Sequence, residues 1–336
     1  MKKAILLNDL TDADIIDSSI YQEYVSLLKK DISSLWTGSG CTKPYSWFDS
    51  SAASLQDVYK ILDVQYQFCP KTQSCFVNPR LNTQALRDFY RDSQACQFWR
   101  KQLCEVDEDQ LYYIYGSRVS WITELVDEYL DRPSVLVDLE TKYPFLLKHI
   151  ENQKIFSTMG TLDPLLFEKE NQLSSRVLQD ARVSTLEGST DVFTAFETLE
   201  RMAEPHRLFS LAAKFCRPGG LLLLTTATCS GFEYQVLKEH APNLNPINRM
   251  NLMSLEFIVD LIQRHGFELI ELSTPGRLDV EIMRKTLERK PDLPVDDFWK
   301  YILHHRDEKT WQGLQNFLQQ NRLSSHVRIA ARKNNG

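Results

Sequence analysis

From Ser134 onwards, short apolar runs alternate with segments of helical periodicity. Residues 135–137, 191–196, 221–226 and 267–273 have the length and composition of buried strands. Strands that are apolar on both sides are typical of parallel sheets whose two faces are covered by helices. Because parallel strands need crossover connections, the alternation predicts an α/β fold with a Rossmann-like, doubly wound sheet.

The end of the chain predicts a strand of a different kind. In residues 326–332, Val327, Ile329 and Ala331 alternate with polar or small residues, a pattern typical of an edge-like strand. No crossover helix of the usual spacing precedes this segment, so we expect it to pair antiparallel with the strand at 267–273. The complete sheet then has about seven strands, of which the last is antiparallel. Other segments of this half are predicted as a strand at 154–159 and as helices at 145–150, 205–215 and 254–264, the last capped by Ser254 and ended by Gly266.

The part of the chain before Ser134 has mainly helical patterns. Helices are expected over residues 11–35, 82–104 and 111–130, with Asn82 as the N-cap of the second. Residues 36–80 are rich in turn formers, aromatic residues and cysteine, which predicts irregular structure there.

These patterns divide the chain into two predicted domains. Residues 1–110 form a helical N-terminal region, and residues 111–336 form the Rossmann-like domain with a helical insertion at 279–323. We interpret the insertion as a helical pair that covers the sheet, although it could also close over a substrate or form a dimer contact.

The charge balance excludes a generally basic surface. The chain has 45 acidic against 39 basic residues, a formal net charge of −6. We therefore expect neither a nucleic-acid partner nor an anionic membrane partner. No apolar run approaches the length that spans a bilayer. The seven cysteines have no disulfide-like spacing, which favours a reducing, cytoplasmic location.

Several short motifs occur in an order that is specific when they are taken together. They are FVNPR (76–80), FYRDS (89–93), DVFTAFETLE (191–200), RPGG (217–220), HGF (265–267), STPGRLDV (273–280) and LSSH (323–326). With these motifs the chain resembles class I S-adenosylmethionine-dependent methyltransferases, of the sugar or small-molecule type with an N-terminal zinc-ribbon-like region. The resemblance implies a cofactor at the carboxyl ends of the first strands and a small-molecule or sugar acceptor.

The resemblance places the cofactor loop after the first strand, where this chain has an altered sequence. Residues 138–144 read DLETKYP, and Glu140 and Pro144 stand where glycines are expected. Glutamate adds a bulky anion and proline removes an N–H group, so both changes oppose cofactor binding. The cofactor-binding residues that the resemblance implies are Asp138, Glu140, Thr141, Tyr143, Asp163 at the end of the second strand, and Phe196.

The catalytic candidates follow from the same resemblance. Methyl transfer needs alignment, and it needs a base only when the acceptor must lose a proton. Glu197, at the end of strand 191–196, is a candidate for orienting the acceptor, and His240 is a candidate base. Arg249 is a third candidate, and both it and Arg201 stand where relatives have histidine.

A zinc site is not expected, although the resemblance includes a zinc-ribbon-like region. Cys41 and Cys69 match the first cysteines of two Cys-x-x-Cys pairs, but Pro44 and Thr72 occupy the partner positions. Tetrahedral zinc needs four good ligands. We therefore predict a metal-free segment in which Cys75 and its neighbours act as buried hydrophobic residues.

Two functions remain open at this point. One is an S-adenosylmethionine-dependent methyltransferase with an atypical loop, which predicts an open pocket at the carboxyl ends of the strands. The other is a catalytically inactive homologue that serves as a binding or regulatory subunit, with a protein partner or as a homodimer. In that case side chains such as Lys142, Tyr143 or Phe196 are expected to fill the pocket.

Overall fold

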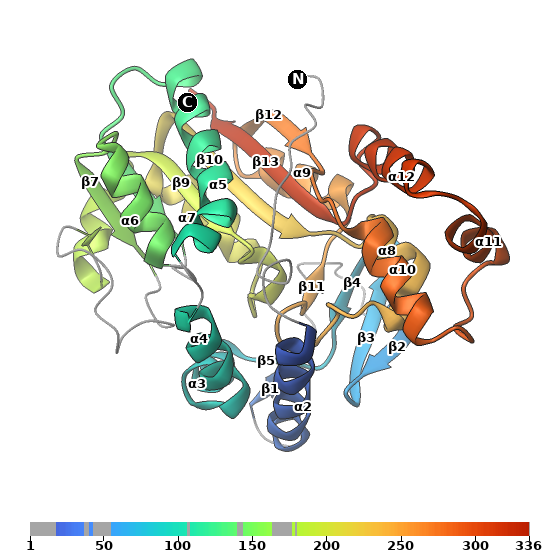
Figure 1. The fold of residues 1–336 in the computed structure, drawn as a ribbon. Coiled ribbons are helices and arrows are strands. Elements are labelled where there is room, and N and C mark those ends of the chain that lie inside the picture. The colour runs from blue at the N-terminus through green and yellow to red at the C-terminus, as the bar shows by residue number, and fades with distance from the viewer. Residues whose placement is uncertain are drawn as a thin grey trace.

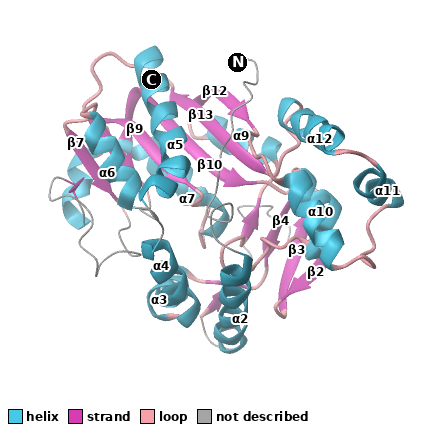
Figure 2. Ribbon diagram, in the orientation of Figure 1, coloured by secondary structure: helices cyan, strands magenta, loops and turns pink. Residues whose placement is uncertain are grey.

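The centre of the molecule is a large sheet with helices on both faces (Figures 1 and 2). The computed structural model describes residues 18–36, 40–42, 55–105, 108–139, 144–162, 177–178 and 180–335. Within these ranges the sheet contains, in spatial order, β12 (Phe267–Ser273), β13 (His326–Lys333), β10 (Cys216–Ala227), β9 (Thr190–Phe196), β6 (Val135–Asp138), β7 (Thr158–Thr161) and β8 (Val177–Leu178).

The order of the strands confirms the Rossmann-like prediction. β6 pairs in parallel with both β7 and β9, so the chain winds outward from β6 in one direction and later in the other. β8 and β10 extend the two halves in parallel, and β13 lies antiparallel between β10 and β12. Strands are added on one side of β6 up to β8 and on the other side from β9 onward. This switch in strand order creates a crevice at the carboxyl ends of β6 and β9, where open α/β sheets bind ligands.

The antiparallel pairing of the last strand with β12 is confirmed, but its position at an edge is wrong. β13 lies inside the sheet and β12 forms the edge. The prediction failed at Arg328, which is 2% exposed and has its guanidinium carbon 4.0 Å from the centre of the Trp121 ring. An arginine buried in this way resembles a solvent-facing residue when only the sequence is considered.

Alternation along the strands directs side chains into two separate cores. Leu221 and Leu223 pack with residues of α5 (Glu108–Tyr129) and α6 (Pro144–Gln153) on one face. Leu222 and Leu224 pack on the other face, with α7 (His206–Phe215) and α9 (Leu255–Arg264). Because successive strand residues point to opposite faces, a continuous leucine run fills both cores.

The predicted helix caps are confirmed. The Ser254 side chain accepts a hydrogen bond from the Phe257 N–H at 3.1 Å, and Gly266 ends α9 with φ at +80°. Asn82 caps α3 (Thr83–Asp92) by accepting from the Ala85 N–H at 2.8 Å. These contacts depend only on neighbouring residues, which explains why the sequence predicts them.

The N-terminal region contains a second sheet, so the irregular structure predicted for residues 36–80 is wrong. β2 (Gln56–Ile61), β3 (Val64–Cys69) and β4 (Ser74–Val77) form antiparallel pairs, and β11 (Asn251–Leu252) adds to β4. The first hairpin turns through Leu62 and Asp63, both with positive φ. Such turns usually contain glycine or asparagine, and their absence here concealed the hairpin. The region also contains α2 (Ser18–Leu35), α4 (Gln94–Glu105), β1 (Cys41–Thr42) and β5 (Arg80–Leu81).

The helical insertion packs against this N-terminal region. It consists of α10 (Asp279–Arg289), α11 (Asp297–His305) and α12 (Glu308–Gln320) rather than of one helical pair. Met283 and Leu287 of α10 share a core with Tyr66 and Val77 of the small sheet. The two parts therefore share one hydrophobic core, and the domain boundary near residue 110 stays a prediction.

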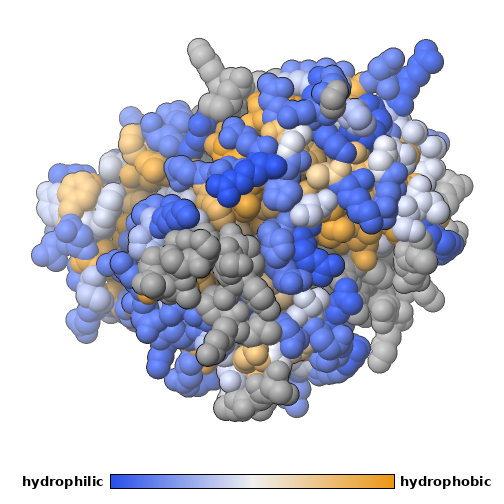
Figure 3. Space-filling model, turned by 180° about the vertical axis from the view of Figure 1, so that it is seen from behind, coloured by the Kyte–Doolittle hydropathy of each residue, from blue (hydrophilic) through white to orange (hydrophobic). Residues whose placement is uncertain are grey.

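The outer surface is mixed in polarity. Seen from behind, hydrophilic residues cover most of the molecule and hydrophobic residues gather toward the centre of that face (Figure 3). Among the described residues, no helix combines the length and apolar character needed to cross a bilayer.

A buried carboxylate joins the starts of two central strands. Asp191 accepts hydrogen bonds from the N–H groups of Ser134 and Val135 at 2.7 and 2.9 Å, and from Arg217 Nε at 2.6 Å. Burial by itself disfavours ionisation, but these donors outweigh it and hold the pKa of Asp191 below its ordinary value.

We expect the Asp191→Asn substitution to lower the free energy of unfolding at pH 7 by about 1–3 kcal/mol. A depressed folded-state pKa contributes stability above the unfolded-state pKa, about 3.9, and this contribution is lost as pH falls through the folded-state value. The difference between wild type and variant should therefore shrink below about pH 4. Urea unfolding at several pH values measures it, with Asp260→Asn as an exposed control. A difference that does not depend on pH would contradict the role of the charge.

Candidate functional site

The crevice at the carboxyl ends of β6, β7 and β9 contains three acidic residues that are nearly inaccessible to solvent. Asp138, the last residue of β6, accepts a hydrogen bond at 2.6 Å from the Thr194 hydroxyl on the neighbouring strand. Glu197 and Glu200 follow the end of β9 and are 4% and 0% exposed. All three acids therefore lie at the same edge of the sheet.

Glu197 has a strained backbone and a carboxylate in a buried ion pair. Its φ is +53°, a conformation that costs a residue with a side chain about 1–3 kcal/mol. Its N–H group donates to the Thr225 carbonyl at 2.8 Å, which holds the turn. Its carboxylate lies 2.6 Å from Arg118 Nη2 of α5, and the two side chains are 4% and 0% exposed. The turn therefore directs Glu197 into a buried ion pair.

Glu200 and Arg249 form a second ion pair at the same edge. Arg249 Nη1 lies 2.8 Å from Glu200 Oε1, and the Thr226 hydroxyl donates to Glu200 Oε2 at 2.6 Å. Burial by itself disfavours the charged form of Arg249. The Tyr234 hydroxyl and the carboxylates of Glu200 and Glu197 outweigh this effect and hold the pKa of Arg249 above its ordinary value. Arg249 thus supplies a permanent positive charge to a buried polar network.

The other predicted residues lie at different places. Phe196 is 3% exposed and packs 6.1 Å from the Trp121 ring, between centroids, on the α5 side of the sheet. His240 ends a short 3-10 helix (Lys238–His240), is about one third exposed, and lies 4.0 Å from the Glu239 carboxylate. Like Asp138, Glu197 and Arg249, neither residue is among the described residues that line the crevice pocket.

Four of the predicted cofactor-binding residues, Glu140, Thr141, Tyr143 and Asp163, lie outside the described residues. Pro144, which stands at a predicted glycine position, is the first residue of α6. Proline suits the first turn of a helix because its missing N–H has no intrahelical partner there. The assignments of catalytic and cofactor-binding residues stay predictions.

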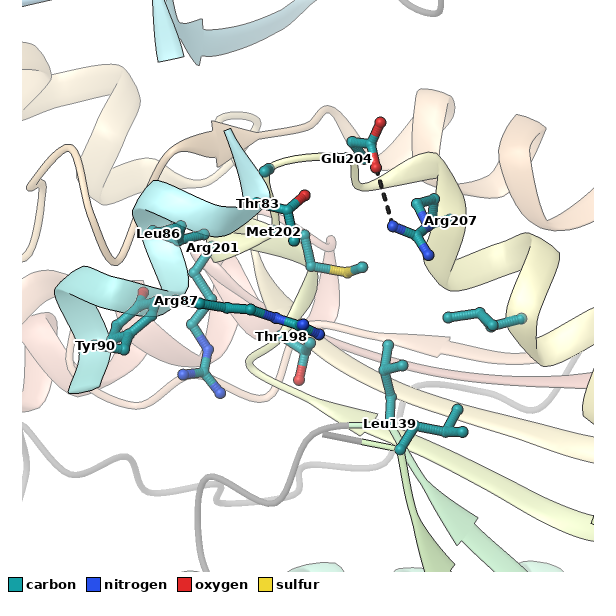
Figure 4. A pocket seen from close by; sticks show the side chains of 13 residues that line it. Thr83, Leu86, Arg87, Tyr90, Leu139, Thr198, Arg201, Met202, Glu204 and Arg207 are labelled. Carbon is teal, nitrogen blue, oxygen red and sulfur yellow. Dashed lines mark hydrogen bonds and ion pairs between the residues drawn. The ribbon is translucent and has the colours of Figure 1, made fainter. Parts of the chain in front are cut away.

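A pocket of about 260 Å³ opens in the crevice (Figure 4). Its walls come from α3, from the ends of β6 and β7, from the segment after β9 and from α7. Three arginines and one carboxylate are among the lining residues, together with a mainly apolar remainder. The lining residues are Thr83, Leu86, Arg87, Tyr90, Leu139, Leu162, Thr198, Arg201, Met202, Ala203, Glu204, Arg207 and Leu211.

Two cysteines of the zinc-ribbon-like region are buried in strands of the small sheet. Cys69 is fully buried at the end of β3, and Cys75 is buried in β4 beside Tyr59. Burial raises the pKa of Cys75 to about 11 and that of Cys229 to about 12, so both remain thiols at neutral pH. The part of the chain that the structure describes contains no group of three or more His, Cys, Asp or Glu side chains suited to a metal ion.

Sequence reasoning missed Arg87 and Arg118 as residues of this site. Arg118 lies in the helix predicted at 111–130, and Arg87 lies in the helix predicted at 82–104. Arg201 stands where a histidine is expected, and the sequence does not indicate that it lines a pocket. The one available signal was that both arginines fall in amphipathic helices, and this pattern does not say which residue a charged side chain will meet.

A family model supports the assignment of the central sheet. Residues 112–272 match the family model described as a methyltransferase domain. No curated protein matches the chain. One similar solved structure is phospholethanolamine N-methyltransferase 2 of Haemonchus contortus, with 14% identity, 77% of this chain and 62% of that chain covered, and a TM-score of 0.43. Another is the cyclopropane synthase MmaA2 of Mycobacterium tuberculosis, with 15% identity, coverage of 65% and 84%, and a TM-score of 0.39.

Proposed function

From the premise that this chain belongs, through residues 112–272, to the methyltransferase-domain family, we propose that it is a homologue that binds a small molecule without transferring a methyl group. In this proposal it acts as a binding or regulatory subunit. The observation that carries it is the engagement of the three buried carboxylates at the crevice. Asp138 accepts from Thr194, Glu197 pairs with Arg118, and Glu200 pairs with Arg249.

Among the described residues, the three engaged carboxylates are not available to the pocket as bases. A general base must lie within hydrogen-bond reach of the proton that it removes. Glu204 is the acidic residue among the described lining residues, and its carboxylate lies 3.1 Å from Arg207 Nη1. Its side chain is 38% exposed, so water also competes for it.

The described residues that line this pocket do not fit S-adenosylmethionine. That cofactor has two positive groups, a sulfonium and an ammonium, against one carboxylate. Arg87, Arg201 and Arg207 line the pocket at the carboxyl ends of the strands, where the sequence predicts the cofactor. Like charges repel, and the effect is largest at the buried Arg201 because the exposed Arg87 and Arg207 are screened by solvent, so the arginines disfavour the cofactor.

We expect calorimetric titration with S-adenosylmethionine, and with its demethylated product, to give no saturable heat up to about 1 mM ligand. A dissociation constant of about 1 mM corresponds to a binding free energy of roughly −4.1 kcal/mol. The double substitution Glu140→Gly and Pro144→Gly should not restore binding, because the ion pairs and the arginines remain. Thermal unfolding of each sample establishes that it is folded.

The open pocket favours the alternative, a methyltransferase with an atypical loop, because a volume of about 260 Å³ is available to a ligand. The same titration decides between the two. Binding tighter than about 100 μM, roughly −5.5 kcal/mol, would overturn the proposal in favour of the enzyme. Binding that appears only in the double variant would locate the defect in the loop alone.

A further inference from the structure

The described lining of the crevice pocket has more positive than negative side chains, on a chain that is negatively charged as a whole. Its described lining contains three arginines against the single carboxylate of Glu204. The formal net charge of the chain is −6. The positive pocket is therefore a local feature and does not reflect a basic surface.

The three arginines lie at different depths. Arg201 is 4% exposed, whereas Arg87 and Arg207 are exposed. In Figure 4 the side chain of Arg87 extends from α3 across the pocket toward Thr198. Arg207 comes from α7, on the other side of the pocket. A ligand entering between α3 and α7 would first meet the two exposed arginines and then Arg201.

The deepest of these arginines is held in a defined orientation. Arg201 Nε donates to the Glu197 carbonyl at 2.9 Å, and its guanidinium carbon lies 5.7 Å from the centre of the Tyr90 ring. The strained turn at Glu197 thus sets the direction of Arg201. A planar guanidinium held on an aromatic ring keeps its charge and offers its donors in a fixed geometry, which suits the oxygens of a carboxylate or a phosphate.

We infer that this pocket binds a small molecule that has an oxyanion group, a phosphate or a carboxylate, attached to a mainly apolar body. The oxyanion contacts Arg87 and Arg201, and the apolar body contacts the leucine and methionine side chains of the wall, which are Leu86, Leu139, Leu162, Met202 and Leu211. The volume, about 260 Å³, is that of a small ligand rather than of a polymer. The inference rests on the proposed function, in which the crevice binds a ligand without methyl transfer.

The test uses phenyl phosphate, benzoate and the uncharged benzyl alcohol as probes, titrated into the full chain by calorimetry in low-chloride buffer. We expect one of the two anions to bind with a dissociation constant below about 1 mM, and benzyl alcohol not to bind. The tighter anion identifies the group, phosphate or carboxylate. Binding should weaken as the salt concentration rises, because the charges are partly exposed.

Substitutions locate the site. Arg87→Gln should weaken binding at least about tenfold, the effect of losing one charge-assisted hydrogen bond. Arg91→Gln is the matched control: Arg91 lies on the same helix, is exposed, pairs with Asp88 and Asp92, and does not line the pocket. Arg201→Gln should weaken binding by a similar factor. Because Arg201 is buried, the thermal unfolding of the Arg201→Gln variant must be compared with that of wild type. Arg87 is exposed, so Arg87→Gln tests the inference without destabilising the fold.

The outcomes separate this inference from the proposed function. If neither anion binds below about 1 mM, or if Arg87→Gln and Arg91→Gln have equal effects, the inference is wrong. If S-adenosylmethionine binds, the proposed function is wrong whatever the anions do. Anion binding that depends on Arg87, with no heat from S-adenosylmethionine, supports both.

Discussion

Replacing Arg118 with methionine is expected to lower the free energy of unfolding by about 3–5 kcal/mol, because the substitution removes the buried guanidinium that pairs with the Glu197 carboxylate. The two side chains are 0% and 4% exposed, and Arg118 Nη2 lies 2.6 Å from the carboxylate. The guanidinium of Arg118 also lies over the Phe196 ring, at 5.6 Å, so its loss removes packing as well as charge. Urea unfolding at pH 7 measures the change.

The matched control for Arg118 is Arg264→Met. Arg264 pairs with Asp260 one helical turn away, and the two side chains are 67% and 40% exposed. Exposed pairs of this kind contribute about 0.2–1 kcal/mol, so the control should change little. The double variant Arg118→Met with Glu197→Gln should recover part of the stability, since no unpaired charge is left. A loss below about 1 kcal/mol for Arg118→Met would contradict the buried ion pair.

A second large effect is expected for Arg249→Met, again a loss of about 3–5 kcal/mol. Glu200 is 0% exposed, and after the substitution only the Thr226 hydroxyl, among the contacts described above, would still donate to it. Arg249→Lys should lose less, because the ammonium keeps the charge although it lacks the planar fork of donors. Urea unfolding should therefore give a free energy of unfolding that decreases in the order wild type, Arg249→Lys, Arg249→Met.

The control for this series is Arg91→Met, whose side chain is 49% exposed and pairs only with carboxylates of neighbouring residues on α3. We expect it to remain close to wild type. If Arg249→Met and Arg91→Met have equal stability, the network at Glu200 does not have the structural role that we assign to it. That result would favour the predicted catalytic role of Arg249.

The alternation of buried runs with helices was sufficient to predict the architecture of the large sheet. The run at 221–226 is leucine-rich because both faces of β10 are covered, and this composition is visible before any contact is known. The caps at Asn82 and Ser254 were predictable for a similar reason: each is made between residues three apart in the chain. Local chemistry is read directly from local sequence.

The hairpin over residues 56–69 and the interior position of β13 were not predictable in this way. The hairpin turns through Leu62 and Asp63, a pair without glycine or asparagine at its positive-φ positions. β4 pairs with β3 and β11 pairs with β4, so the hairpin is part of a larger sheet. β13 contains a buried arginine that stacks on Trp121, more than 200 residues earlier in the chain. In both cases a distant partner decides the environment of a residue.

The candidate site divides in the same manner. The sequence could indicate that Asp138 and Glu197 end neighbouring strands, because the strands themselves were recognisable. It could not indicate that Arg118 neutralises Glu197, or that Arg87, Arg201 and Arg207 line one pocket, because these residues come from α5, α3 and two segments after β9. Hydrophobic periodicity reports which side of a helix is buried, whereas the partner of a charged side chain depends on how whole elements pack, and that is decided by the three-dimensional fold.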